Sequence, residues 1–253
     1  FVDGFARRFR GRDDARPVAA GGDPSRTGRG SAAEVRSTRR LTSSGWRPIP
    51  HASGVAAKQA PADVLLRILG HYNVCSKEWI IRQYDHEVQG GSVIKPMVGL
   101  HETGPSNAAV IAPVPGKWKA FAVGCGIHTR LGRIDPYAMA SCAIDEAVRN
   151  VVAVGADPSQ IALLDNFCWA DTDRPEELGL LVRCAEACHD LAVEWMMPFI
   201  SGKDSLKNEY KGKDRRIAIP PTLLISALGQ LADARQAISM DFKSAGHHIY
   251  LVG

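Results

Sequence analysis

The pattern of apolar and polar positions divides the chain near residue 60. Residues 1–50 show neither a 3.6-residue nor a 2-residue repeat of apolar side chains over any useful length. A segment without such a repeat buries too little apolar surface to offset the conformational entropy lost on folding. We therefore predict that residues 1–60 form a disordered or out-of-family extension, and that the folded part begins at about residue 61.

From residue 61 onward the pattern predicts helices that alternate with strands. A short helix is expected over Ala62–Leu69, closed by Gly70, and a second over about Ser76–Tyr84 with Ser76 as its N-cap. The other expected elements are strands over 106–114, 119–127, 160–169, 198–201 and 220–231, and helices over about 136–154 and 175–195. This alternation is typical of an α/β fold with mixed layers.

The helix expected over about 136–154 has the clearest periodicity in the chain, and Gly155 stops it. Its apolar stripe consists of Met139, Cys142, Ala143, Ala147, Val151 and Val154. Glu146 and Asn150 are four residues apart, so both point to one side, near the edge of the stripe. Asp145 is expected to point away towards solvent. A last strand is predicted over 247–253, where the chain stops, and an ending within a strand suggests a fragment.

The overall composition adds little to this picture, but the distribution of charge along the chain is informative. Hydrophobic residues make up 45% and charged residues 23% of the chain, which is typical of globular proteins. Residues 1–50 contain eleven Arg, no Lys and five acidic residues, so the basic excess is local. A nucleic-acid-binding arm is one interpretation. We favour a disordered extension, or a segment read out of frame, and predict no nucleic-acid partner.

Targeting and redox signals favour the cytoplasm. No apolar run approaches the roughly 20 residues of a membrane span, and the N-terminus lacks the apolar core of a signal peptide. The six cysteines form no CxxC pair, which is typical of reduced thiols in a cytoplasmic protein. Cys184, Cys188 and His189 are close enough on one helix to suggest a metal site, but small thiols on an apolar helix face usually belong to the core.

The run "PFISGKDSLKNEY" ends an apolar stretch in Gly-Lys-Asp-Ser and raises the question of a phosphate-binding loop. The common phosphate loop needs a glycine five residues before its Gly-Lys pair, and Met197 stands there instead. The loop of that type is therefore excluded. What remains is a strand over 198–201 that brings Gly202, Lys203 and Ser205 to one turn.

Polar residues follow three of the predicted strands. These residues are Arg130, Arg133 and Asp135 after the first, Asp165 and Asn166 at the end of the second, and Gly202, Lys203, Asp204 and Ser205 after the third. Ligands of α/β layers collect at strand ends. Carboxylates and Asn suit Mg²⁺, whereas Arg and Lys suit phosphate, so a nucleotide or a phosphorylated substrate is indicated. Glu146 and Asn150 can also hold a divalent cation, although their spacing alone favours a partly solvated helix edge with Glu146 paired to Arg149 or a Lys.

Several separated motifs resemble one known family. The runs "SKEWIIRQYDHEVQGGSVIKP", "GPSNAAVIAP", "RIDPYAMASCAIDEAVRNVVAVGADP", "LLDNFCW" and "PFISGKDSLKNEY" occur in the order found in the synthetase subunit of phosphoribosylformylglycinamidine synthase. The resemblance covers about residues 62–253. It implies a helical linker over 61–100, an aminoimidazole ribonucleotide synthetase-like N-terminal domain of the second half over 101–235, and the truncated start of its C-terminal domain over 236–253.

The resemblance also assigns residues. Asp165 and Gly202 match family positions that contact ATP, and Ser205 matches a position assigned to the substrate. Glu146 and Asn150 match Mg²⁺ ligands of the longer relatives, which reverses the preference from spacing. Lys203 stands where many relatives have a metal-binding Asn, so it is expected to meet phosphate directly. The catalytic His motif of the family lies in the first half, which this chain lacks, so no catalytic residue is predicted here.

The implied activity is part of an ATP-dependent ligase of purine biosynthesis. It converts formylglycinamide ribonucleotide, with ammonia from glutamine, to formylglycinamidine ribonucleotide. The implied partners are the missing N-terminal half, a glutamine amidotransferase subunit and a small accessory subunit. Another ATP-using enzyme of the same superfold is disfavoured by the linker motif "YDHEVQGG". A non-catalytic nucleotide-binding or scaffold fragment stays open as the alternative.

Overall fold

The computed structural model describes residues 60–83 and 88–250, in two units that comprise residues 1–75 and 76–253. The described part of the first unit contains helix α2 (Pro61–Leu69), as the sequence predicts. Pro61 occupies the first turn, and the N–H of Gly70 donates to the carbonyl of Leu66 at 2.9 Å. The extension predicted over 1–60 lies, apart from Ala60, outside the described residues.

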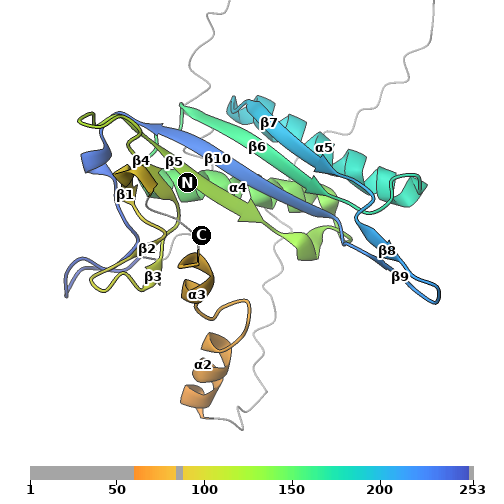
Figure 1. Ribbon diagram of the computed structural model, residues 1–253, viewed down its shortest axis with the longest axis horizontal. Coiled ribbons are helices and arrows are strands. Elements are labelled where there is room, and N and C mark those ends of the chain that lie inside the picture. Colours follow the sequence, from red (N-terminus) through yellow and green to blue (C-terminus); the bar gives the residue numbers. More distant parts are fainter. Residues whose placement is uncertain (1–59, 84–87, 251–253) are drawn as a thin grey trace, which may run out of the picture. The chain divides into compact units, whose positions relative to one another are not determined.

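A six-stranded sheet forms the centre of the second unit, with the strand order β1-β4-β5-β10-β6-β7 (Figure 1). Strands β6 and β7 pair in parallel and all other neighbours pair antiparallel. The strands of this sheet are β1 (Ser92–Ile94), β4 (Ala109–Ile111), β5 (Ala120–Ile127), β6 (Ile161–Cys168), β7 (Phe199–Ser205) and β10 (Thr222–Leu231). Because β10 is antiparallel to both β5 and β6, the C-terminal ends of β5, β6 and β7 lie at the same end of the sheet.

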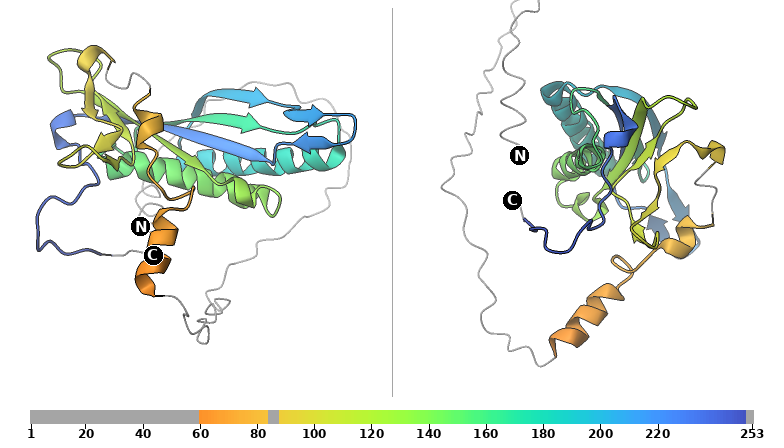
Figure 2. Two further views of the ribbon diagram at one scale, coloured as in Figure 1. Left: turned by 60° about the horizontal axis from the view of Figure 1, so that its bottom comes forward. Right: turned by 90° about the vertical axis from the view of Figure 1, so that its left-hand side faces the viewer.

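Two long helices cover one face of the sheet, α4 (Pro136–Ala153) and α5 (Pro175–Trp195) (Figure 2). Along β10 the side chains alternate, with Leu223, Ile225 and Ala227 buried under the helices and the residues between them partly exposed. The smaller elements are α3 (Glu78–Ile81), β2 (Met97–Val98), β3 (Gly104–Pro105), β8 (Glu209–Lys211) and β9 (Arg216–Ala218), with short 3-10 turns at 88–90, 129–131 and 234–236. Strands β2–β3 and β8–β9 form separate two-stranded pairs.

Glycines in β5 let α4 approach the sheet closely. A Cβ atom on Gly126 would overlap the carbonyl oxygen of Ala143, and one on Gly124 would lie 3.0 Å from Cβ of Asn150. No larger residue fits at Gly126 without moving the helix. At the far end of α4, Gly155 has φ +108°, a left-handed conformation that favours glycine, and it ends the helix as predicted.

Strand lengths differ from the prediction because pairing, not hydrophobicity, sets them. The strand predicted over 106–114 is shortened to β4, since Pro113 lacks the N–H that a ladder needs. Strand β7 continues through Ser205, so the predicted turn at Lys203 is wrong: pairing with β6 extends to Cys168↔Ser205. The strand predicted over 247–253 is absent from residues 247–250, which are exposed and have no partner strand, and residues 251–253 are not described.

Two helix predictions also need correction. Of the helix predicted over about 76–84, the described residues form only α3, with Lys77 at its N-cap and Arg82 at its C-cap. Within α4, Cys142 is exposed and does not belong to the apolar stripe, whereas Ile144 and Val148 are buried. The stripe is therefore shifted by part of a turn, because α4 packs against both the sheet and α5.

Candidate functional site

Glu146 and Asn150 of α4 bind the backbone of β5 near its end. Among the described residues β4 pairs with β5 only as far as Val123, so the same edge of β5 has no strand partner beyond that point. Asn150 Nδ2 donates to the carbonyl of Cys125 at 2.9 Å, and the N–H of Ile127 donates to Glu146 Oε2 at 2.8 Å. The two side chains thus satisfy backbone groups that a neighbouring strand would otherwise pair.

A hollow of about 300 Å³ lies beside this pair, lined by His128, Cys142, Asp145, Glu146, Arg149 and Asn150. His128 Nε2 lies 3.3 Å from Glu146 Oε2. Arg149 pairs with Asp145 at 2.7 Å and not with Glu146, so that part of the solvated-edge interpretation is wrong. Asp145 is 37% exposed and Glu146 43% exposed. Asp145, which is expected from the sequence to point towards solvent, is partly exposed and lines the hollow, where it pairs with Arg149.

The free oxygens of the pair fit a hard cation. Within the described residues, Glu146 Oε1 and Asn150 Oδ1 make no hydrogen bond, while the other polar atom of each side chain is anchored on β5. Carboxylate and amide oxygens are ligands that Mg²⁺ accepts. No group of three or more His, Cys, Asp or Glu side chains in the described part of the chain could hold a metal ion. A cation at this pair would therefore need phosphate oxygens or water to complete its shell.

Asp165 and Gly202 face each other as register partners in β6 and β7. A Cβ atom on Gly202 would overlap Asp165 Oδ1, so the glycine leaves room for the carboxylate. Asp165 Oδ1 is buried and has no hydrogen-bond partner. Burial, and then the charge of Asp204, raise the pKa of Asp165 above its ordinary value, against hydrogen bonds from backbone N–H groups that lower it. Asp165 also helps to raise the pKa of Cys188 on α5, so its carboxylate lies on the helix-covered face.

Lys203 and Ser205 lie on the opposite face of β7. Side chains alternate along a strand, and these two are out of phase with Gly202. Lys203 Nζ donates to Ser205 Oγ. Across the sheet, Lys203 continues a row through Asn166 of β6 and Leu224 of β10. The four residues predicted to form one ligand site are therefore divided between two faces of the sheet.

The α4 pair and the β7 residues are not in contact with each other. Strands β5 and β7 are separated by β10 and β6, which corresponds to a distance of about 14 Å at the usual strand spacing. Both groups nevertheless lie towards the end of the sheet where β5, β6 and β7 terminate. A ligand that contacts both would have to extend across several strands.

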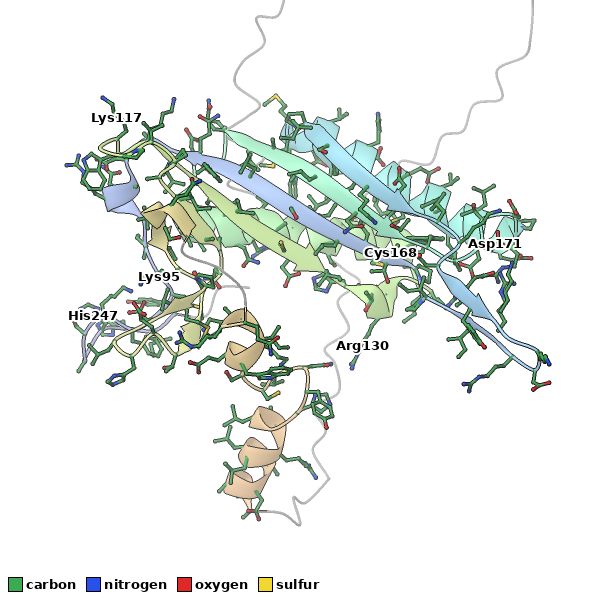
Figure 3. All side chains as sticks on the ribbon, in the orientation of Figure 1. Lys95, Lys117, Arg130, Cys168, Asp171 and His247 are labelled. Carbon is green, nitrogen blue, oxygen red and sulfur yellow. The ribbon has the colours of Figure 1, made fainter. Side chains whose placement is uncertain are left out.

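Of the other residues predicted at strand ends, Asp135 and Arg133 have structural contacts. Asp135 Oδ1 accepts from the N–H of Ala138 at 3.0 Å and caps α4. Arg133 pairs with Glu177 at 3.1 Å. Arg130 is exposed in the turn after β5 (Figure 3). Asp165 and Asn166 lie within β6 and not at its end, because that strand continues to Cys168.

Sequence reasoning missed a group of charged residues at the same end of the sheet, which we term the hairpin ion cluster. Three of its carboxylates, those of Asp171, Glu177 and Glu209, are buried. The cluster comprises Asp171, Asp173, Glu177 and Glu209 with Arg133, Arg174, Lys207, Lys211 and Arg216. Only the alternation of Glu209, Lys211 and Arg216 around the turn of the β8–β9 hairpin could have pointed to it.

The structure does not bring Cys184, Cys188 and His189 together as a metal site. Both thiols are buried, and burial is the main cause that raises the pKa of Cys188 to about 12. The side chain of His189 is 75% exposed and lies 3.0 Å from Asp190. The thiols belong to the core because they lie on the inner face of α5, whereas His189 lies on its outer face.

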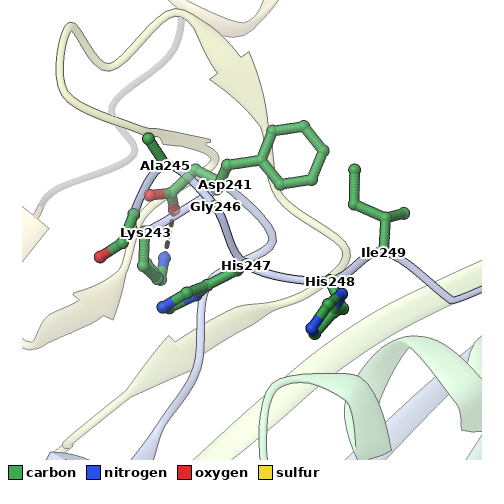
Figure 4. Close-up of a pocket in the computed structure, with 9 residues that line it drawn as sticks. Asp241, Lys243, Ala245, Gly246, His247, His248 and Ile249 are labelled. Atoms are coloured by element: carbon green, nitrogen blue, oxygen red, sulfur yellow. Dashed lines mark hydrogen bonds and ion pairs between the residues drawn. The ribbon is translucent and has the colours of Figure 1, made fainter.

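A second hollow, of about 580 Å³, is lined by residues 241–249 (Figure 4). It is formed by one segment that curls on itself, held in part by Lys243, which donates to Asp241 at 2.7 Å. None of the predicted site residues lies there. No helix among the described residues is long and apolar enough to cross a membrane.

The fold and the polar strand ends define a mixed α/β domain with two helices on one face of its sheet. The family described as "AIR synthase related protein, N-terminal domain" matches residues 105–231, half of the chain. The chain therefore belongs to this family, and the predicted fold class is confirmed. The domain boundaries predicted at residues 60, 100 and 235 stay predictions.

Two similar proteins are the same subunit of one enzyme. The chain is 32% identical over 206 residues to phosphoribosylformylglycinamidine synthase subunit PurL of Rhodopseudomonas palustris, covering 81% of this chain and 26% of that protein. It is 34% identical over 191 residues to PurL of Picrophilus torridus, covering 75% and 25%. The chain thus spans about a quarter of the length of these relatives, and the resemblance seen in the sequence is confirmed.

Solved structures of PurL are also similar to this chain. The structure of PurLQS from Thermotoga maritima matches with a TM-score of 0.52 at 27% identity, covering 64% of this chain and 25% of that one. PurL of the same organism complexed with AMPPCP also matches with a TM-score of 0.52, at 25% identity, covering 66% and 26%.

Proposed function

We propose that this chain is part of the synthetase of phosphoribosylformylglycinamidine synthase, an ATP-dependent ligase that forms a C–N bond. In the proposed reaction the γ-phosphoryl group of ATP passes to the amide oxygen of formylglycinamide ribonucleotide. Ammonia derived from glutamine then displaces phosphate and leaves the amidine, with ADP as the other product. Membership of the family and the similarity to PurL support this assignment.

The observation that carries the proposal is the anchoring of Glu146 and Asn150 on β5. Each side chain uses one polar atom to bind the strand and keeps one oxygen free beside a hollow. We propose that these oxygens hold Mg²⁺, which when bound neutralises charge on the phosphates of a nucleotide. The protein's own contribution is to fix both oxygens in advance, so that little reorganisation is needed on binding.

The remaining proposed contacts come from β6 and β7. We propose that Asp165 and Gly202 contact ATP, that Lys203 binds a phosphate, and that Ser205 binds formylglycinamide ribonucleotide. The exposed ammonium of Lys203 at the end of β7 supports a phosphate contact, because an ammonium binds phosphate as a compact point charge. The PurL of Thermotoga maritima has been solved with ATP and with AMPPCP, which supports ATP as the nucleotide.

The proposed partners are the parts of the enzyme that this chain does not contain. The sheet face that no described helix covers presents partly exposed apolar side chains, including Val123 and Leu224, and this supports a further part of the synthetase packing there. A glutamine amidotransferase subunit and a small accessory subunit are proposed from the resemblance, and the PurLQS structure of a relative supports an assembly. The cytoplasm stays the predicted location, on the sequence pattern alone.

A non-catalytic nucleotide-binding or scaffold role is the second candidate. One observation favours it: the four residues proposed to contact ATP, phosphate and substrate on β6 and β7 are divided between two faces of the sheet. The two candidates differ in whether a complete synthetase that contains this chain turns over ATP. ATP binding without turnover in a complete synthetase would support the scaffold role.

The test of the proposed metal pair is Glu146→Gln, measured in a complete synthetase that contains this chain. Calorimetric titration of ATP should show affinity about tenfold weaker than wild type with Mg²⁺ present and unchanged affinity without it, since removing an anionic ligand lowers cation affinity. Gln keeps an oxygen that can accept from the N–H of Ile127. Asp145→Asn is the matched control, because Asp145 lines the same hollow but pairs with Arg149. Identical affinities for Glu146→Gln and wild type in both conditions would return the pair to a structural role.

A further inference from the structure

Ser205, the last residue of β7, is held by the turn that follows it. Its carbonyl oxygen accepts from the N–H of Trp169 at 2.9 Å and from Asn208 Nδ2 at 2.8 Å. The N–H of Asn208 donates in turn to the carbonyl of Trp169 at 2.8 Å, and the N–H of Ile219 donates to the carbonyl of Asn208 at 3.0 Å. Asn208 therefore joins the end of β7 to the segment after β6 and to the chain that leaves β9.

This turn depends on contacts from outside itself. Lys207 has φ +64°, a left-handed conformation that a non-glycine residue keeps only when its surroundings impose it. Its N–H donates to the carbonyl of Ala170 at 3.3 Å, and its Nζ donates to Asp173 at 2.6 Å. The hairpin that follows has only three residues in each strand, and an isolated hairpin of this size is marginal in water.

The hairpin ion cluster attaches the β8–β9 hairpin to the rest of the domain, and Glu209 is at the centre of the cluster. The side chain of Glu209 is only 2% exposed. It pairs with Arg216 across the hairpin, with Lys211 at 3.1 Å, and with Arg174 at 3.7 Å. Arg174 also lies 3.4 Å from Glu177 in the first turn of α5, so the hairpin is joined to the helix layer. Figure 3 shows charged side chains gathered around Asp171 at this end of the sheet.

The charge of Glu209 is maintained at neutral pH. Burial raises the pKa of this carboxyl, but hydrogen bonds from Arg216 and Lys211 outweigh burial and leave the pKa below its ordinary value. Loss of that charge would leave the cations around it without their common partner. These cations are partly exposed and keep Asp171 or Glu177 as a second partner, so the loss weakens the charge-assisted contacts that attach the hairpin and lets it move more freely.

We propose that Glu209 is a positioning residue, which fixes the β8–β9 hairpin and through Asn208 holds Ser205 and Lys203 in place for a phosphate-bearing ligand. The ligand part of this claim rests on the proposed function. Glu209 itself touches no ligand in this proposal. Its effect reaches Ser205 through the hydrogen bonds of Asn208 and the pairing of Lys203 Nζ with Ser205 Oγ.

Glu209→Gln tests the proposal because it keeps the shape of the side chain and removes its charge. In hydrogen exchange on the chain, amides of residues 203–211 should exchange about tenfold faster than in wild type. In a complete synthetase containing the chain, KM for formylglycinamide ribonucleotide should rise about tenfold while kcat stays within twofold. Asp214→Asn is the matched control: Asp214 lies in the turn of the same hairpin, but it is exposed and belongs to none of the ion pairs of the cluster, so both readouts should stay at wild-type values.

The possible outcomes separate the claims. Unchanged exchange in Glu209→Gln overturns the proposal, and faster exchange with unchanged KM reduces Glu209 to a purely structural residue. If the wild-type synthetase shows no turnover that depends on formylglycinamide ribonucleotide, the proposed function is overturned. The claim that Glu209 positions residues for that ligand then falls with it. If Glu209→Gln does not fold, Asn208→Ala removes one hydrogen bond to Ser205 and leaves the ion cluster intact. An unchanged KM in that variant also overturns the proposal.

Discussion

At the scale of single residues, the surroundings of Asp165 oppose the ionisation of its carboxyl. Its buried Oδ1 has no hydrogen-bond partner, and its pKa is raised by burial and by Asp204. A carboxyl whose pKa is higher in the folded chain than in the unfolded chain opposes folding when it is ionised, and this cost disappears as the pH falls below its unfolded value. Unsatisfied buried groups of this kind require an explanation, and a role in binding is one.

We predict that Asp165→Asn raises Tm at pH 7 by roughly 1 to 3 °C. The difference from wild type should vanish below about pH 3, where the carboxyl is mostly protonated in both folded and unfolded chains. Asp157→Asn is a control of opposite sign, because hydrogen bonds from Ser159 lower the pKa of Asp157 and its ionised form stabilises the fold at pH 7. Thermal denaturation followed by circular dichroism measures both. A lower Tm for Asp165→Asn at pH 7 would contradict this account.

At the scale of elements, the position of α4 on β5 decides where Glu146 and Asn150 lie. Gly126 allows the helix to contact the strand backbone, and the end of β4 leaves the neighbouring edge of β5 free for side chains of α4. A larger residue at position 126 would push the helix outward. The hydrogen bonds to Cys125 and Ile127 would then be lost together.

Gly126→Ala is therefore expected to lower the free energy of unfolding by about 2 to 4 kcal/mol, measured by chemical denaturation. Gly179→Ala in α5 is the control, since a Cβ atom there meets no atom within 4 Å. Alanine should stabilise that helix by about 0.5 to 1 kcal/mol. A neutral or stabilising effect of Gly126→Ala would contradict the close packing of α4 on β5.

The elements that the sequence predicts well are those with local signals. Pro175 marks the start of α5 and Gly155 follows the end of α4, and both lie next to the helix in sequence. The length of β7 was not predictable, because it depends on pairing with β6, about 37 positions away. The spacing of Glu146 and Asn150 placed them on one side of a helix. It could not show that they would bind β5, because this requires β4 to end early.

The hairpin ion cluster could not be predicted for a related reason. Its members come from four separate segments, around residues 133, 171–177, 207–211 and 216. Each segment alone reads as an ordinary solvated loop. Only the common direction of β5, β6 and β7 brings these loops to one end of the sheet.

At the scale of the whole molecule, the break in composition near residue 50 leads to a prediction about proteolysis. The first 50 residues lack a repeating apolar pattern, while the chain from residue 61 contains the predicted elements. Limited proteolysis, followed by mass spectrometry, should remove roughly the first 50 to 60 residues and leave the rest intact. Protection of that segment under conditions that cleave an unfolded control protein would contradict the predicted boundary.

The central claim is that this chain works as one part of an ATP-dependent amidine-forming synthetase, and phosphate release from ATP tests it most directly. Release should be measured for the chain alone and for a complete synthetase that contains it, with and without formylglycinamide ribonucleotide and ammonia. We predict release only from the complete synthetase, and only when formylglycinamide ribonucleotide is present, because the chain spans about a quarter of the PurL relatives. Amidine formation by the chain alone, or no substrate-dependent release from the complete synthetase, would contradict the account.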